Sequence, residues 1–158
     1  FRNDFTDLIN FPFPTFVATN IDRAFSGGVE LIGSFRLDDQ TNITASYTNT
    51  KTLDKATQRP LLRRPRHKFN VGVNRQFLDN HANLSLNLRF NGDRADFGTV
   101  LDEAMVLDIA GSLQLTDRVR LFARIDNATD AEYEEVFSFQ TPSLSAYGGV
   151  VIEFGQGE

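Results

Sequence analysis

The chain of 158 residues contains no cysteine and only two histidines. Without cysteine it can form neither a disulfide framework nor a thiolate metal site, and the lack of thiols also fits an oxidising compartment. His67 and His81 fall at opposite ends of one predicted strand, which argues against a shared metal site. We therefore expect no metal and no cofactor.

Long apolar runs and catalytic motifs are also missing. No run of about 18 apolar residues is present, so a transmembrane helix is excluded, and no charged-then-apolar segment marks a signal peptide. Patterns such as G-x-S-x-G, the P-loop or paired carboxylates are absent, which predicts that the protein is not an enzyme. A net charge of -5 and the lack of a basic stripe with interleaved aromatics argue against nucleic acid as a partner.

What the sequence does contain is alternation of apolar and polar residues with a period of two. The clearest case is Asn83 to Asn91, where Leu84, Leu86, Leu88 and Phe90 alternate with polar residues. The pattern recurs in further segments, which together give about nine strands and an all-β fold: Phe1–Ile9, Phe16–Ile21, Val29–Leu37, Ile43–Tyr47, Phe69–Val73, Met105–Leu115, Val119–Ile125 and Leu144–Phe154.

The connections between these strands alternate in length. Short turns are expected at Phe11–Thr15, Asp38–Thr41, Leu78–His81 and Thr116–Arg118, and long polar segments at Lys51–Arg64, Gly92–Ala104 and Asn127–Ser143. A short link near Asp22–Ser26 is the exception. This alternation predicts an antiparallel up-and-down meander.

Two architectures fit such a meander. In a soluble barrel or sandwich the apolar side chains point inward, whereas in an outer-membrane barrel they point outward to lipid. Even strand lengths, loops of unequal length at the two ends and aromatics near strand ends favour the membrane barrel. The aromatics in question, suited to interfacial girdles, are Phe1, Phe5, Phe90, Phe122 and Phe154. The alternation alone leaves both architectures open.

Several motifs, in order, resemble the C-terminal barrel strands of TonB-dependent outer-membrane receptors, with the cobalamin receptor branch most similar. They are "RNDFTDLI" (2–9), "TNIDRAFSGGVEL" (19–31), "ASYTNTKTLD" (45–54), "LLRRPRHKFN" (61–70) and "LFARIDNATDAEY" (121–133). The resemblance implies a barrel of about 22 strands with a plugged lumen, of which residues 1–154 form the last nine or so and 155–158 a short polar tail. We expect a piece of a longer protein, with TonB contacted only through the missing N-terminal part.

The resemblance also implies roles for individual residues. Asn127 and Asp130 belong to a segment similar to the family's turn before the last extracellular loop, where such side chains tolerate tight turns. The end of the chain resembles the family's assembly signal, which presents a strand edge to the barrel assembly machinery. The signal residues are Tyr147, Gly149, Ile152 and Phe154.

Candidates for contact with a ligand are fewer. Arg63 and Arg64 could steer an anionic ligand at the mouth of a barrel, and Tyr133 and Phe137 lie in the last long loop. Arginines also solvate a barrel lumen without binding anything.

The sequence therefore predicts the C-terminal part of a receptor that lies in lipid of the bacterial outer membrane. Its ligand would be a metal chelate, either cobalamin or a ferric siderophore. The alternative is a soluble β-barrel or sandwich that binds a small ligand or carbohydrate, and this alternative requires the opposite burial. A porin-like barrel without a plug is a third possibility, against which the "LLRRP" and "NATDAEY" segments argue.

Overall fold

The computed structural model describes residues 1–11 and 15–154, and every regular element within them is a β-strand. Eight strands form one antiparallel sheet in the order β1-β2-β3-β4-β5-β8-β9-β12. Their bounds are β1 Arg2–Asn10, β2 Thr19–Arg36, β3 Thr41–Asp54, β4 His67–Phe77, β5 Ala82–Asn91, β8 Ala104–Thr116, β9 Val119–Asp126 and β12 Ser145–Ile152. Two short hairpins pair β6 (Arg94–Asp96) with β7 (Thr99–Leu101), and β10 (Glu134–Val136) with β11 (Phe139–Gln140). Among the described residues, no helix is long and apolar enough to cross a membrane.

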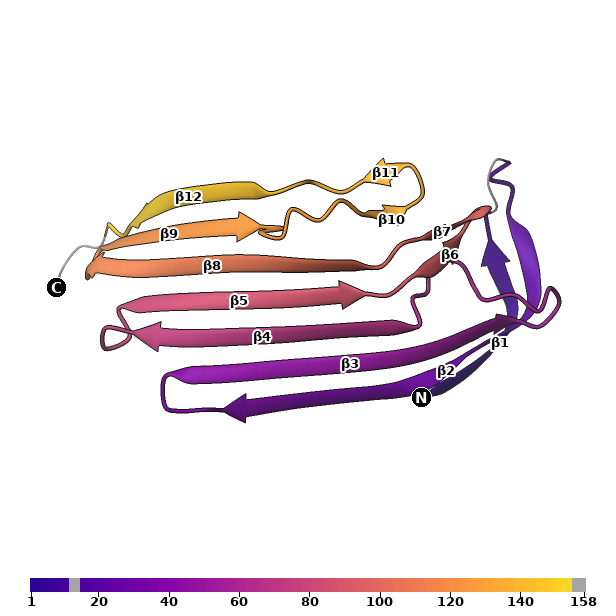
Figure 1. Ribbon diagram of the computed structural model, residues 1–158, viewed down its shortest axis with the longest axis horizontal. Coiled ribbons are helices and arrows are strands. Elements are labelled where there is room, and N and C mark those ends of the chain that lie inside the picture. The colour runs from indigo at the N-terminus through magenta and orange to yellow at the C-terminus, as the bar shows by residue number, and fades with distance from the viewer. Residues whose placement is uncertain (12–14, 155–158) are drawn as a thin grey trace.

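Each main strand pairs with its sequence neighbour in the sheet, which confirms the predicted all-β meander (Figure 1). At one end, short turns join β2 to β3, β4 to β5 and β8 to β9. At the other end, long segments at 55–66, 92–103 and 127–144 carry both short hairpins. We call this second end the loop end. Two predictions concern residues outside the described part of the chain. They are the turn at Phe11–Thr15, through its residues 12–14, and the polar tail at 155–158.

The short link expected near Asp22–Ser26 is not found, because these residues lie inside the continuous strand β2. Ser26, Gly27 and Gly28 weaken the strand signal in the sequence. In the fold, β1 pairs with β2 up to Gly27 and β3 pairs with it from Ala24 onward, so Ala24 to Gly27 have a partner strand on both sides. A Cβ on Gly28 would lie 1.9 Å from the backbone oxygen of Asn49, so glycine here permits the close approach of β2 and β3. Two predicted segments therefore form one strand of 18 residues.

One face of the sheet is apolar across seven strands, and we call it the outer face. Register carries it from strand to strand: Leu31 pairs with Tyr47, Tyr47 with Phe69, Phe69 with Phe90 and Phe90 with Met105. On β8, alternate residues from Met105 to Leu113 share this face. Nine residues match the length that a tilted strand needs to cross a bilayer.

The opposite face, which we call the inner face, is polar and hydrogen-bonded from strand to strand. Asn74 donates to Ser85 (2.8 Å), and Asn83 donates to Asn74 (3.0 Å). Arg89 and Asp108 form an ion pair of 3.0 Å. Such networks suit a water-filled or protein-filled lumen.

Two aromatics expected in interfacial girdles lie on the inner face. Phe122 pairs with Gly149 and covers it with its ring, since a Cβ on that glycine would lie 2.6 Å from the ring. Phe5 pairs with Ala24, which is buried. A ring that covers a glycine of the next strand replaces the packing that the glycine lacks. Phe90, in contrast, lies on the outer face as a girdle residue should.

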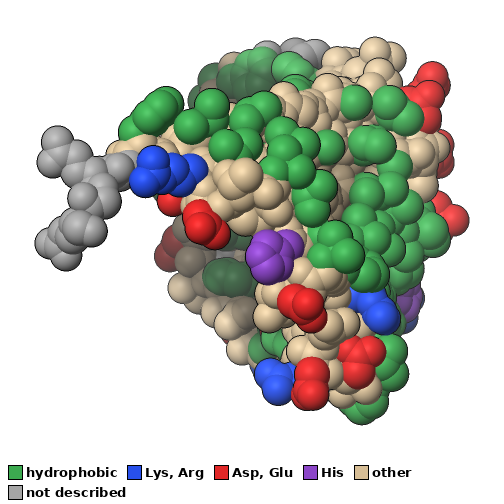
Figure 2. All heavy atoms as spheres, turned by 90° about the vertical axis from the view of Figure 1, so that its left-hand side faces the viewer, with side chains coloured by type: hydrophobic (Ala, Val, Ile, Leu, Met, Phe, Trp, Pro, Cys, Tyr) green, Lys and Arg blue, Asp and Glu red, His purple; other side chains and the backbone are tan. Residues whose placement is uncertain are grey.

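No closed apolar interior exists in the described part of the chain. The buried hydrophobic residues there are Ala24, Leu101, Ala104 and Val106, none of them on the outer face. Hydrophobic side chains instead gather along one side of the curved wall, as Figure 2 shows in a view along the strands. The soluble alternative requires the reverse burial, so the structure argues against it.

Candidate functional site

Three long segments meet at the loop end and are held together by a buried carboxylate. Asp96 at the end of β6 has a side chain with 0% exposure. Its Oδ1 accepts hydrogen bonds from Arg63 Nε (3.0 Å) and from the backbone N–H of Phe97 (2.9 Å). Its Oδ2 accepts one from the backbone N–H of Phe137 (2.8 Å). Asp96 therefore connects segments 55–66, 92–103 and 127–144.

The charge of Asp96 is stabilised by these donors. Burial alone would raise the pKa of this carboxyl, but the N–H groups of Phe137 and Phe97 and the guanidinium of Arg63 outweigh it, so the pKa lies below its ordinary value of 3.8. Arg63 also lies over the ring of Phe97 at 5.1 Å. At neutral pH Asp96 is therefore ionised and accepts all three hydrogen bonds.

A second buried polar side chain orders the last loop. Asn127 is only 4% exposed and has a left-handed backbone with φ of 52°. Its amide nitrogen donates to the carbonyls of Ala131 (3.0 Å) and Pro142 (3.2 Å), and its amide oxygen accepts from Ala131 N–H (3.0 Å) and Thr129 Oγ1 (3.1 Å). One side chain thus joins the start of the loop to its end.

Asp130 extends the same arrangement. Its backbone is also left-handed, with φ of 49°, and its Oδ1 accepts a hydrogen bond from Leu144 N–H at 3.0 Å. Its own N–H donates to the Asn127 carbonyl at 2.9 Å. The structure therefore places both predicted turn residues at the base of segment 127–144.

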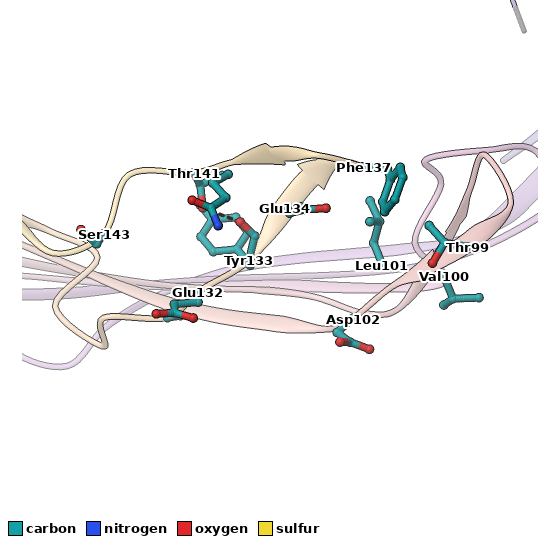
Figure 3. Close-up of a pocket in the computed structure, with 12 residues that line it drawn as sticks. Thr99, Val100, Leu101, Asp102, Glu132, Tyr133, Glu134, Phe137, Thr141 and Ser143 are labelled. Carbon is teal, nitrogen blue, oxygen red and sulfur yellow. Dashed lines mark hydrogen bonds between the residues drawn. The ribbon is translucent and has the colours of Figure 1, made fainter. Parts of the chain in front are cut away.

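Above this base lies a cavity of about 540 Å³ between the two short hairpins (Figure 3). This volume falls within the range of small-molecule sites. Tyr133 and Phe137, both predicted ligand candidates, line it. Its acidic lining comes from Asp102, Glu132 and Glu134, and no lysine or arginine of the described chain lines it.

The two arginine candidates do not line this cavity. Arg63 is engaged with Asp96 and Phe97, and Arg64 donates to the carbonyl of Arg63 at 3.3 Å. The structure therefore brings Tyr133 and Phe137 together at one site and leaves Arg63 and Arg64 beside it.

Three of the predicted assembly residues, Tyr147, Gly149 and Ile152, lie on β12, whose other edge pairs with no strand in the described chain. Tyr147 and Gly149 pair with Arg124 and Phe122 on the inner face. Ile152 is half exposed, and Phe154 follows the strand with 93% of its surface exposed.

Two residues important for the loop end were missed by sequence reasoning. Asp96 and Arg94 stand in "GDRADFG", where nothing distinguishes them from other loop charges. Arg94 is buried and its Nη2 donates to the carbonyl of Glu134, which links β6 to β10. Glu134 lies 40 residues from Arg94, and Arg63 and Phe137 lie 33 and 41 residues from Asp96, so only the fold brings these partners together.

A sheet that is apolar outside and polar inside, with short turns at one end and structured loops at the other, is the wall of an outer-membrane β-barrel. The sequence profile of the TonB-dependent receptor-like β-barrel family matches residues 1–128. The chain belongs to this family. It is accordingly a protein of the Gram-negative outer membrane and not an enzyme.

Several solved structures share the fold of this chain. The copper transporter OprC has a TM-score of 0.79 at 20% identity, and the match covers 97% of this chain and 27% of OprC. The ferripyoverdine receptor of the Pseudomonas aeruginosa outer membrane has a TM-score of 0.77 at 14% identity, over 97% of this chain and 24% of that one. The ferric yersiniabactin uptake receptor FyuA from Yersinia pestis has a TM-score of 0.76 at 16% identity, and the match covers 97% of this chain and 26% of FyuA. The chain thus spans about a quarter of the length of these proteins.

Proposed function

We propose that this chain is the C-terminal part of a TonB-dependent receptor barrel that takes up a metal chelate. The observation that carries the proposal is the cavity at the loop end of an amphipathic barrel wall, lined by Tyr133 and Phe137. A ligand caught there would lie at the mouth of the lumen. Contact with TonB is proposed to belong to another part of the receptor.

Among the possible chelates, a ferric siderophore is our first candidate. The ferripyoverdine receptor and FyuA, both named for ferric siderophores, share this fold. The cavity adds two aromatic rings and three carboxylates, which favour a ligand that offers hydrogen-bond donors over one rich in negative charge. Cobalamin is the second candidate, on the resemblance of the sequence motifs.

Uptake assays test this proposal on the complete receptor that carries these residues. We expect cells that produce it to import radiolabelled iron from at least one siderophore, in a TonB-dependent way. Tyr133→Ala and Phe137→Ala should each weaken binding about tenfold, because each removes an aromatic contact. The matched control is Phe139→Ala, since Phe139 belongs to the same hairpin, is 71% exposed and does not line the cavity. Equal loss in all three variants, or import of neither siderophore iron nor cobalamin, would contradict the proposal.

We also propose that the end of β12 serves barrel assembly. The open edge of β12 and the exposed Ile152 and Phe154 support recognition by strand addition. Phe154→Ala is expected to lower the amount of folded receptor in the outer membrane, whereas Phe139→Ala should not. Unchanged amounts of folded Phe154→Ala receptor would refute this role.

A further inference from the structure

The cavity between the two short hairpins has carboxylates in its lining that the protein itself does not pair with cations. Asp102 and Glu132 are both exposed there. In the part of the chain that the structure describes, Asp102, Glu132 and Glu134 belong to no ion pair. The side chain of Glu134 accepts one hydrogen bond, from the uncharged backbone N–H of Ser138 at 3.0 Å. The cavity thus presents three carboxylates without an ion-pair partner in the described chain.

The surroundings of the cavity do not supply the missing positive charge. Segment 127–144 contains four acidic residues and no lysine, arginine or histidine. Arg94, which links β6 to β10, donates to the backbone carbonyl of Glu134 and not to its carboxylate. Arg63 is already paired with Asp96. A ligand that enters the cavity therefore meets a negative electrostatic potential.

The two aromatic rings of the cavity act in the same direction as its carboxylates. Tyr133 and Phe137 both line it, and in the view of Figure 3 the carboxylate of Glu134 lies between the two rings. The face of an aromatic ring attracts a cation through the ring quadrupole. Carboxylates attract the same charge and repel an anion. Both kinds of lining group thus favour a positively charged part of a ligand.

We infer that the cavity selects a metal chelate that carries an ammonium or guanidinium group. Such a group would lie among the carboxylates and the two rings of the cavity, and chelates of negative charge would be disfavoured. This inference rests on the proposed function, because it names the class of chelate that the receptor takes up. Chelates with identical metal-binding groups should therefore be distinguished by the charge of the rest of the molecule.

The test uses the complete receptor that carries these residues, purified in neutral detergent, and three ferric chelates that bind iron through the same hydroxamates. They are ferric desferrioxamine B, which ends in an ammonium group, its neutral N-acetyl derivative and its negatively charged N-succinyl derivative. Affinities are measured by isothermal titration calorimetry. We expect ferric desferrioxamine B to bind about tenfold more tightly than the N-acetyl derivative, because acetylation removes the attraction to both the rings and the carboxylates. The N-succinyl derivative should bind most weakly, and added salt should weaken binding of ferric desferrioxamine B.

A pair of double variants tests whether the lining carboxylates cause this preference. Asp102→Asn/Glu132→Gln should bind ferric desferrioxamine B about fivefold more weakly, since each exposed carboxylate contributes roughly twofold to threefold. It should bind the N-succinyl derivative no more weakly than the original protein does. The matched control Asp93→Asn/Glu135→Gln removes one aspartate and one glutamate from the same two segments. Both control residues are exposed and neither lines the cavity, so this variant should keep the original affinities.

Binding of none of the three chelates would overturn the inference, as would binding of the N-succinyl derivative as tight as that of ferric desferrioxamine B. Equal losses in the two double variants would overturn it as well, because the lining carboxylates would then have no specific role. In each of these cases, import of iron from another siderophore would leave the proposed function intact, whereas import of no chelate would contradict both. If Asp102→Asn/Glu132→Gln fails to fold, the comparison of the three chelates in the original protein still decides.

Discussion

The wall and the loop end of this protein are stabilised in different ways. In the wall, from β2 to β12, backbone ladders run in register and side chains alternate between an apolar and a polar face. At the loop end, strand pairing is limited to hairpins of two or three residues per strand. A few buried polar side chains connect the segments there instead. Arg94, Asp96 and Asn127 are three of the five buried polar residues in the described chain.

Sequence changes should therefore have different consequences in the two regions. In the wall each position is defined by its face, so a substitution that respects the face is tolerated and one that violates it is not. At the loop end, single side chains connect distant segments through hydrogen bonds. Replacing such a side chain with one that cannot form these bonds should therefore not be tolerated. Four substitution experiments test this contrast.

The largest effect is expected for a charge on the outer face. Leu88→Arg places a cation in the lipid near the middle of the apolar band and should lower the free energy of unfolding by about 2–4 kcal/mol. Asn87→Arg, one residue earlier on the inner face, should change it little. Both are measured by denaturant unfolding in phospholipid vesicles. Similar losses for the two variants would break the assignment of faces.

Asn127→Ala comes next, with an expected loss of about 2–3 kcal/mol, because the side chain satisfies groups at both ends of the last loop. Asn127→Gly should lose roughly 1 kcal/mol less, since glycine adopts the left-handed backbone freely. The control is Asn80→Ala, where φ is 72° but no side-chain hydrogen bond is formed within the described chain. If Asn127→Ala lowers the free energy of unfolding no more than Asn80→Ala does, the side-chain hydrogen bonds of Asn127 contribute nothing to stability.

Asp96→Asn should loosen the loop end and leave the wall intact. The amide cannot accept all three hydrogen bonds that the carboxylate accepts, so we expect roughly tenfold weaker ligand binding and faster cleavage of segment 127–144 by external protease. Asp93→Asn, an exposed acid just before β6, is the control. Unchanged protease sensitivity in Asp96→Asn would exclude a connecting role.

The pH dependence of this connection follows from the lowered pKa of Asp96. A carboxyl whose folded pKa lies below its unfolded value of 3.8 stabilises the fold above that value. Its contribution is lost as the pH falls below 3.8 through the folded pKa. Protease sensitivity of the original protein should therefore stay constant at mildly acidic pH and approach that of Asp96→Asn only in strong acid.

The smallest effect is expected at two adjacent glycines of β12. Gly149→Ala forces the ring of Phe122 to move, at a cost of about 1 kcal/mol. Gly148→Ala, whose Cβ would come no closer than 3.6 Å to the backbone oxygen of Phe122, should cost little by comparison. Equal unfolding free energies for the two variants would contradict the ring position that the structure shows.

Much of the wall could be predicted from the sequence because a period of two assigns each residue to a face without knowledge of its neighbours. The prediction was wrong where a neighbouring strand decides. The link expected near Asp22–Ser26 lies inside β2, and Phe122 faces inward to cover Gly149. At the loop end, Tyr133 and Phe137 were predicted as ligand candidates from their place in one loop, and both line the cavity; contact with a ligand stays a prediction. The connecting role of Asp96 could not be found, since it depends on three segments meeting in space.

Fluorescence quenching can show directly which face of the wall touches lipid. Because the chain has no cysteine, single fluorescent labels can be attached after Leu88→Cys and Asn87→Cys in the protein reconstituted in vesicles. We expect quenchers carried by lipid chains to dim the label at position 88 and water-soluble quenchers to dim the label at position 87. Equal quenching at the two positions, or the reverse pattern, would contradict an apolar face that points outward to lipid.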